Sequence, residues 1–221
     1  MGIIELLGSC VDMLIPDECP ICGVRMTAHS SPVCPACRGS LLSESALAPV
    51  SSGHIPAIWS CLPYSGVLRE CIKQFKYHGR KRMTRVFFDL AGEYLAEKPV
   101  PVDIIDSLIP VPICSARLRE RRFNQSELIA GILCRLVSKP VCVHNLTKSE
   151  NTPPQNGLSR NRRIDNLKGS FFTRDPAAMR DKTILLVDDV MTTGATLETC
   201  AEELLRAGAK KVLGFTLART L

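Results

Sequence analysis

The stretch ILLVDDVMTTGATLETC, residues 184–200, decides the fold of this chain. Its four apolar residues at 184–187 predict a buried strand, and the apolar spacing of Leu197–Leu205 predicts a helix that ends before Gly208. Two adjacent carboxylates and the run Thr-Thr-Gly-Ala-Thr separate the strand from the helix. Adjacent carboxylates repel each other and threonine disfavours helix interiors, so this composition does not suit an ordinary loop. The stretch therefore predicts a ligand site, or else an unusually acidic helix start.

Strands and helices are expected to alternate along the rest of the chain. Four further apolar segments are expected to be strands: Ala57–Tyr64, Ile104–Val111, Val141–His144 and Val212–Leu217. Helical spacing of apolar residues predicts helices between them, one of which follows the capping residues Asn124 and Glu127. This alternation is typical of an α/β fold with a mostly parallel sheet flanked by helices on both faces. Residues 39–56 are rich in Ser, Pro and Ala and are expected to form a linker.

The segment between the predicted strand and helix suits a ribose 5-phosphate. Open parallel sheets bind ligands beyond the carboxyl ends of their strands, where Asp188 and Asp189 are expected to lie, and these carboxylates suit a sugar diol or a metal ion that holds one. The unpaired N–H groups and positive dipole end of the following helix favour a phosphate monoester. The predicted phosphate-binding residues are Thr192, Thr193, Gly194, Ala195 and Thr196.

Three other interpretations of this segment were weighed. A threonine-capped helix needs only one threonine, and it does not explain the paired acids. A receiver-type acidic pocket explains the acids but gives no reason for the Thr-Thr-Gly-Ala-Thr run. A Walker B acid needs a partner sequence GxxxxGK[ST], which does not occur in the chain. The ribose-phosphate interpretation accounts for both halves of the segment.

Four cysteines form two C-x2-C pairs near the N-terminus, in CPICG at 19–23 and CPACRG at 34–39. Two such knuckles complete a closed tetrahedral site of four thiolates, so Cys19, Cys22, Cys34 and Cys37 predict a structural Zn²⁺ site in a small ribbon. The alternatives are redox dithiols or unpaired thiols, but a redox motif would appear once, at a helix start. The other seven cysteines show no pairing pattern and are expected to be mostly buried thiols.

The composition predicts a cytoplasmic protein without membrane insertion. Residues 1–16 are expected to form a short helix and lack the basic region and cleavage site of a secretory signal. No apolar run is long enough to cross a membrane. An odd count of 11 cysteines then favours a reducing compartment. The formal net charge of +6 permits an anionic partner without requiring one.

Two basic stretches, 73–85 and 117–122, are candidates for contact with an anionic ligand. Phe75 and Tyr77 alternate with cations in the first stretch, a pattern that also suits single-stranded nucleic acid. The alternative for both stretches is a solvated charged face, and Phe75 also fits the core face of its helix. The segment Lys148–Ser170 is long, polar and rich in turn residues, which is typical of a lid or of a disordered loop.

Several motifs together resemble a known family. VDDVMTTGAT resembles the loop of type I phosphoribosyltransferases that binds phosphoribosyl pyrophosphate, PRPP. The four-cysteine module, YSGVLRECIKQFKYHG, IPVPICSARLRERRFNQSELIA and TPPQNGLSRNRRIDNLKGSF precede it in the order of the ComF (competence protein F) family. The resemblance covers nearly the whole chain. It implies an N-terminal helix and zinc ribbon at 1–40 and a phosphoribosyltransferase-like domain at 57–221.

The resemblance assigns a role to each motif. Asp188 and Asp189 would contact the ribose hydroxyls, residues 192–196 would hold the 5-phosphate, and Arg117 would lie near the pyrophosphate loop that follows Val111. The implied residues of a mobile loop are Thr152, Gln155 and Arg163. The chain departs from the family in two places: Arg122 stands where Gly is usual, and Cys114, Ser115 and Ala116 stand where a His-Pro pair is common.

The resemblance implies transfer of phosphoribose from PRPP to an unknown acceptor, with Mg²⁺ and with release of pyrophosphate. It also implies a link to DNA uptake, with single-stranded DNA or a DNA-uptake helicase as a partner. The alternative is a protein that handles DNA and senses nucleotides through the same pocket without turnover. The PRPP loop supports binding in both cases, so it does not distinguish them.

Overall fold

The apolar runs that flank the acidic pair form adjacent strands at the centre of one sheet. The computed structural model describes residues 18–26, 31–149, 167 and 169–221. The strands are β1 Val50–Ser52, β2 Ile55–Pro63, β3 Ser107–Pro110, β4 Leu146–Lys148, β5 Phe171–Thr173, β6 Thr183–Met191 and β7 Lys211–Arg219. The α-helices are α2 Pro35–Leu42, α3 Gly66–Tyr77, α4 Thr84–Glu97, α5 Ser115–Arg121, α6 Gln125–Val137 and α8 Ala195–Arg206. The helix expected at 1–16 lies outside the described residues.

The main sheet has five strands in the order β1-β2-β7-β6-β3. β2, β7, β6 and β3 are parallel, and only β1 pairs antiparallel, at the edge. Strand β6 lies between β3 and β7, with Val187 opposite Pro110 on one side and Phe215 on the other. This confirms the predicted α/β fold with a mostly parallel sheet.

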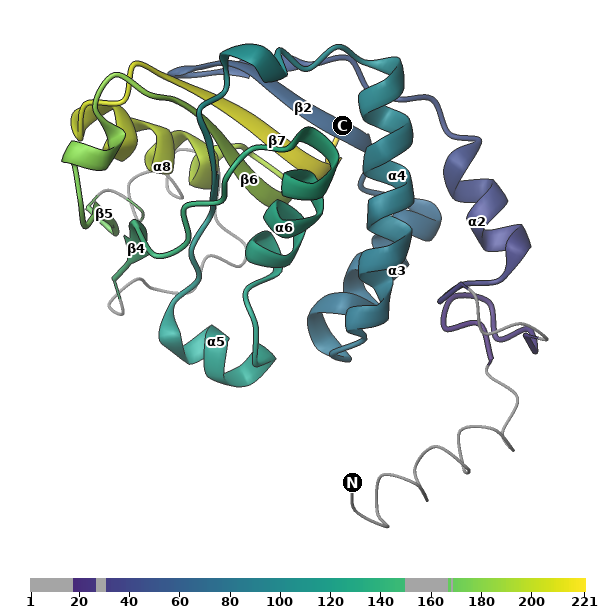
Figure 1. Cartoon of the computed structure of the whole chain (residues 1–221). Coiled ribbons are helices and arrows are strands. Elements are labelled where there is room, and N and C mark those ends of the chain that lie inside the picture. The colour runs from purple at the N-terminus through teal and green to yellow at the C-terminus, as the bar shows by residue number, and fades with distance from the viewer. Residues whose placement is uncertain (1–17, 27–30, 150–166, 168) are drawn as a thin grey trace.

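Helices cover both faces of the sheet (Figure 1). Alternate residues of β6 point to opposite faces, so Leu185 and Val187 pack in one core while Ile184 and Leu186 pack in another. The first core is closed by α3, α4 and α6, and the second by α8 and the β4–β5 pair. Every one of these four β6 side chains is buried, as expected for the central strand of a parallel sheet.

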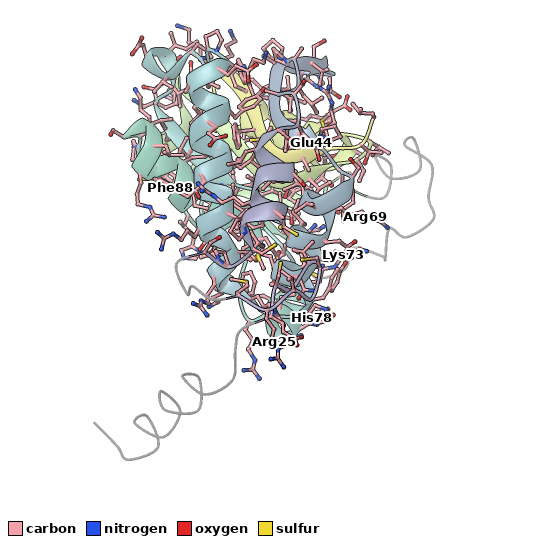
Figure 2. The ribbon with its side chains drawn as sticks, turned by 90° about the vertical axis from the view of Figure 1, so that its right-hand side faces the viewer. Arg25, Glu44, Arg69, Lys73, His78 and Phe88 are labelled. Atoms are coloured by element: carbon pink, nitrogen blue, oxygen red, sulfur yellow. The ribbon has the colours of Figure 1, made fainter. Side chains whose placement is uncertain are left out.

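The cysteine-rich segment packs against the helices of the first core. Cys34, Cys37 and Leu41 are buried in the same cluster as Phe75 of α3, and Arg38 of α2 forms an ion pair with Asp89 of α4 at 3.0 Å. Figure 2 shows this side of the molecule, with α2 lying along α3 and α4. The division into a module at 1–40 and a domain at 57–221 stays a prediction, and its two parts share a core.

Three expectations about local structure were wrong. The expected linker 39–56 contains the end of α2 and strand β1, which joins the sheet through β2. The expected strand 141–144 is reduced to one bridge between Val141 and Leu108. The second cysteine knuckle opens a helix and not a ribbon strand, because Cys34 is the N-cap of α2 and Pro35 follows it in the first turn, where proline is favoured.

The lengths of β3 and β6 also differ from the prediction. β3 begins only at Ser107, because a short 3-10 helix occupies Val102–Ile104. β6 continues past Val187 to Met191, because β7 runs alongside it and supplies partners as far as Arg219. The acidic pair therefore lies within a strand that has lost its neighbour on one side only.

Candidate functional site

The two carboxylates of β6 lie at the point where β3 ends. Val111 N–H donates to Val187 O at 2.8 Å, and beyond this bond the chain leaves the sheet toward α5. Asp188 and Asp189 follow directly on β6, with only β7 as a neighbour. An edge opened in this way at the carboxyl end of a parallel sheet is the usual place for a ligand.

The two carboxylates have different partners, although both partners come from helices that cover the same face of the sheet. Asp188 Oδ1 accepts from Ser126 Oγ of α6 at 2.9 Å and from the Asp189 N–H at 2.9 Å. Asp189 Oδ2 forms an ion pair with Lys76 Nζ of α3 at 2.7 Å. An ammonium group therefore stabilises Asp189, and two hydrogen-bond donors, a hydroxyl group and an N–H group, stabilise Asp188.

Lys76 is a structural counter-ion of Asp189. Its side chain is only 16% exposed and that of Asp189 only 9%. Burial lowers the pKa of Lys76, but its interactions with Asp189 and Asp188 together raise it by more. The pKa therefore lies above its ordinary value, and the lysine stays charged at neutral pH. The sequence analysis grouped Lys76 with basic residues that could contact an anionic ligand, and its position in α3, one residue before Tyr77, gave no sign of this pairing.

The surroundings of Asp188 disfavour its ionised form. Burial, followed by repulsion from Asp189, raises the pKa of Asp188 to about 7, against the opposing effects of Lys76, the Asp189 N–H and Ser126. At neutral pH this carboxyl group therefore carries a proton for part of the time. A ligand that donates hydrogen bonds to Asp188 would favour the ionised form.

The segment after β6 forms a loop whose conformation depends on Gly194. This residue has φ +78°, in the left-handed region that favours glycine, and a Cβ there would lie 3.2 Å from Ser52 Oγ of β1. Helix α8 begins at Ala195, and its first intrahelical bond is donated by the Glu198 N–H to Gly194 O at 2.9 Å. The N–H groups before Glu198 have no carbonyl partner within the helix. Asp188 and the predicted phosphate-binding residues 192–196 line one small hollow at this helix start.

Asn124 aligns α6 with the acids. Its Nδ2 donates to Val111 O at 3.0 Å, and its Oδ1 accepts from the Ser126 N–H at 3.1 Å as a helix cap. Because Ser126 in turn donates to Asp188, one side chain fixes both the end of β3 and the N-terminus of α6 relative to β6. The sequence predicted the cap but not the contact between Ser126 and Asp188.

The four cysteines of the doubled C-x2-C motif come together as predicted. Their sulfur atoms all lie within 4.8 Å of one another, and Cys22 Sγ lies 3.6 Å from Cys34 Sγ. Zinc–sulfur bonds of about 2.3 Å in a tetrahedron require sulfur separations of about 3.8 Å. The Cys34 N–H donates to Cys19 Sγ at 3.4 Å. Burial raises the pKa of Cys19, but N–H donors such as this one lower it by more, to about 6. A cluster of four sulfur atoms with these separations fits a zinc ion.

Comparison with known proteins identifies the family. Residues 124–219 match the family described as "Phosphoribosyl transferase domain". The chain is 30% identical to "DNA utilization protein YhgH" of Salmonella typhimurium, over 95% of this chain and 100% of that protein. It is 29% identical both to "Competence protein ComFC" of Bacillus subtilis, over 91% of this chain and 78% of the relative, and to "Competence protein F" of Haemophilus influenzae, over 67% and 66%. The chain belongs to the competence protein F family.

Arg122 stands where the family that the chain resembles usually has Gly, and the backbone conformation at this position suits glycine. Arg122 ends α5 with φ +64°, the left-handed conformation in which glycine carries no steric penalty. Arg122 is exposed and its N–H donates to Leu118 O at 2.7 Å, so the turn forms in spite of the side chain. Cys114 precedes α5 as its N-cap residue, and Ser115 and Ala116 form its first turn.

A cation that the sequence did not single out lies near the predicted site. Lys148, the last residue of β4, interacts electrostatically with Arg117 of α5 and with Asp188.

The mobile-loop candidates Thr152, Gln155 and Arg163 lie outside the described residues, but both flanks of their segment are held together. Ser149 N–H donates to Ser170 O at 2.7 Å, beside the β4–β5 pair. The only sequence signal for Lys148 was its place at the start of the polar segment.

Among the helices that the structure describes, none combines the length and the apolar character needed to span a membrane.

Replacement of Asp188 by Asn is expected to stabilise the unliganded protein at pH about 8 but not at pH about 4.5. Because the pKa of Asp188 is raised in the folded state to about 7, the folded protein holds this proton more tightly than the unfolded chain, and stability falls as pH rises from about 4 to about 7. Urea denaturation should show a gain of roughly 1–3 kcal/mol at the higher pH.

Asp106→Asn is the matched control with the opposite sign. The Thr183 N–H lowers the pKa of Asp106, so its ionised form favours the folded state and its loss should destabilise the protein at the higher pH. Equal destabilisation by Asp188→Asn at both pH values would show that Asp188 acts as an ordinary structural acceptor.

Proposed function

We propose that this protein binds PRPP at the β6–α8 junction and transfers its phosphoribosyl group to an acceptor, releasing pyrophosphate. The observation that carries the proposal is the juxtaposition of the acidic pair with the helix start at Gly194, inside the segment that matches a phosphoribosyl transferase domain. The 5-phosphate would receive hydrogen bonds from the first N–H groups of α8. The ribose hydroxyls would donate to Asp188 and Asp189; Asp188 lines the same hollow as residues 192–196, whereas Asp189 is paired with Lys76.

The chemistry requires charge neutralisation and a dry site. Breaking the C1–oxygen bond of PRPP develops positive charge on the ribose and negative charge on the leaving pyrophosphate. The pyrophosphate would enter as its Mg²⁺ complex, which neutralises part of that charge. Arg117 is an exposed cation at the pyrophosphate side of the proposed site. The mobile loop predicted within 148–170, with Thr152, Gln155 and Arg163, would exclude water from the site.

A second candidate function keeps the binding site and removes the turnover. In this alternative the protein senses PRPP or a related nucleotide while it takes part in DNA uptake, as the words "DNA utilization" and "Competence" in the names of its relatives suggest. Its supporting features are Cys114, Ser115, Ala116 and Arg122 on the pyrophosphate side, which depart from the pattern of the family that the chain resembles. Release of pyrophosphate from PRPP, assayed with candidate acceptors, distinguishes the two functions.

We also propose a cytoplasmic location, in which the cysteines remain thiols or zinc ligands.

PRPP binding is expected to require both ends of the motif. Thr193→Val keeps volume but removes a phosphate donor, and should lower PRPP affinity about ten- to a hundred-fold. Gly194→Val should do worse, because its Cβ would meet Ser52 and its φ of +78° disfavours valine. Isothermal calorimetry with PRPP and Mg²⁺ measures both effects.

Thr84→Val at the start of α4 is the matched control and should bind PRPP like the parent protein, because Thr84 Oγ1 only donates to Lys81 O. A folded Gly194→Val protein with parental affinity would show that the phosphate does not lie at this helix start, and the proposed function would then be abandoned.

We propose that Cys19, Cys22, Cys34 and Cys37 hold a structural zinc ion. The four sulfurs have the separations that a tetrahedral site needs. With four protein ligands the ion keeps no open position, so its role is to stabilise the fold. Cys34 and Cys37 also belong to the buried cluster that contains α3, so the ion would support the helix that carries Lys76.

Purified protein is expected to contain about one zinc ion per chain by elemental analysis. Cys34→Ser should abolish zinc binding and lower the free energy of unfolding by a few kcal/mol, roughly, because the metal-binding energy is lost from the folded state. The PRPP site should survive in the fraction that remains folded. Cys134→Ala, a half-buried thiol of α6, is the control that keeps the zinc. Metal-free protein with parental stability would contradict the assignment.

We propose single-stranded DNA as the partner of a basic cleft between the first cysteine knuckle and the turn from α3 to α4. The cleft has a volume of about 830 Å³, and its cations are Arg25, Arg80, Lys81 and Arg82, against one acid, Glu18. Figure 2 shows Arg25 and His78 at this end of the molecule. Tyr77 is 64% exposed beside the turn, whereas Phe75 is buried in the core. Of these two rings, Tyr77 is the exposed one that could stack on a base, and the Arg121 guanidinium lies 5.4 Å from its centroid.

Single-stranded DNA should bind weakly, with affinity that falls steeply as salt is added. Arg80→Gln combined with Lys81→Gln should reduce the slope of log affinity against log salt by about 0.7 for each phosphate contact that is lost. Fluorescence anisotropy over a salt series measures the slope. Lys210→Gln, an exposed cation just before β7, should leave it unchanged. Affinity without salt dependence would exclude this contact.

A further inference from the structure

The turn between β1 and β2 lies against the start of α8. A Cβ at Gly194 would lie 3.2 Å from Ser52 Oγ and 3.8 Å from Ser52 Cβ, so Ser52 occupies the space that a side chain at position 194 would need. Gly194 is buried and directly precedes α8. Ser52 is the last residue of β1, a strand within the segment that was expected to be a linker. The loop proposed to hold the 5-phosphate therefore packs against a second element of the sheet.

The same turn makes a further contact with α8. Gly53 follows Ser52 and lies so close to Glu198 that a Cβ at position 53 would overlap the Glu198 carboxylate. The φ of Gly53 is +52°, in the left-handed region where glycine carries no steric penalty. Glu198 belongs to the first turn of α8, and its N–H donates to Gly194 O at 2.9 Å. Two consecutive hairpin residues thus contact the two residues whose hydrogen bond closes the first turn of α8.

The hairpin is anchored in the second core. Ser52 pairs with Ile55, and Val50 pairs with Ile58. Both isoleucines are fully buried in the core cluster that also contains Leu197 of α8. The register is irregular between Val50 and Ser52, and such an irregularity changes the direction in which a strand side chain points. The position of Ser52 is therefore set by β2 and by the core.

The contact between Gly53 and Glu198 concerns the charge next to the proposed phosphate. Side chains of an α-helix lean toward its N-terminus, so Glu198 leans from the first turn of α8 toward residues 192–196. A carboxylate in that loop would repel a phosphate and compete with it for the same N–H groups. Because Gly53 has no side chain, the Glu198 carboxylate can lie against the hairpin instead.

We infer that the β1–β2 hairpin is a positioning element for the phosphate loop: Ser52 supports the left-handed turn at Gly194, and Gly53 holds the Glu198 carboxylate against the hairpin. The inference rests on the proposed binding of the 5-phosphate of PRPP at the start of α8. Ser52 and Gly53 are positioning residues, because neither lines the hollow at this helix start. Changes at either residue should weaken every ligand that carries the 5-phosphate, including ribose 5-phosphate.

The test measures two properties of the full chain: affinity for ribose 5-phosphate by calorimetry, and the free energy of unfolding by urea denaturation. Gly53→Ala places a methyl group where the Glu198 carboxylate lies, so the carboxylate is displaced and affinity should fall about ten-fold. Adding Glu198→Ala removes the displaced charge and should restore affinity to within about three-fold of the parent. Stability should not recover with it, because a φ of +52° disfavours alanine in both variants.

Ser52 is tested with a conservative variant. Ser52→Ala removes the hydroxyl group beside Gly194 and should lower the affinity for ribose 5-phosphate about three- to ten-fold. Ser52→Thr keeps the hydroxyl group and should retain the parental affinity. Ser51→Ala changes an exposed neighbour on the same strand, and as the matched control it should leave affinity unchanged.

The outcomes separate the inference from the proposed function. If the parent protein binds ribose 5-phosphate and both Gly53→Ala and Ser52→Ala bind it equally well, the inference is overturned and the proposed function stands. The inference is also overturned if affinity in the double variant recovers only in step with stability, since the hairpin would then be an ordinary part of the fold. If the parent binds neither ribose 5-phosphate nor PRPP, the proposed function fails and the inference fails with it. Should Gly53→Ala not fold, Gly53→Asn allows the same comparison, because asparagine tolerates the left-handed conformation.

Discussion

Two carboxylates side by side on one strand are the constraint around which this structure is arranged. Their repulsion at the end of β6 is relieved by a lysine from α3 on one side and by a hydroxyl and an N–H group on the other. These contacts set the ends of α3 and α6 against the sheet. Asn124 then joins α6 to the end of β3, so the strands and helices that surround the acids are held by a few short polar contacts.

The cysteine centre is connected to this arrangement through α3. Cys34 and Cys37 pack in the core that contains Phe75, and Lys76 follows Phe75 directly in the chain. A change at the cysteines can therefore alter the position of the counter-ion of Asp189 without touching the ligand. Such coupling would be carried by packed side chains, since Phe75 also contacts the rings of Phe87 and Phe123 at centroid distances of 5.2 and 5.0 Å.

Local sequence was sufficient where a feature depends on neighbours in the chain. The periodicity of 184–200 correctly predicted β6, the loop at Gly194 and α8, and the cysteine spacing predicted the four-sulfur cluster. It was insufficient where partners are distant. Nothing local indicates that Lys76 meets Asp189, and β4 and β5 are too short for an apolar pattern to reveal them. Lys148 was missed for that reason, because its setting depends on β5.

Two ionisable groups near the site have charged forms that burial disfavours, and these charges have opposite signs. Asp188 is a carboxyl group whose ionised form is disfavoured by burial, and Lys148 is an ammonium group whose charged form is disfavoured in the same way. Asp188 and Lys148 interact electrostatically, yet they do not form an ion pair among the described residues. A ligand with hydroxyl donors at one end and negative charge at the other would satisfy both at once. A sugar bearing a diphosphate has this distribution, whereas a plain phosphate monoester would leave the lysine uncompensated. The proposed ligand PRPP would offset both penalties, because it carries hydroxyl groups and a diphosphate in one molecule.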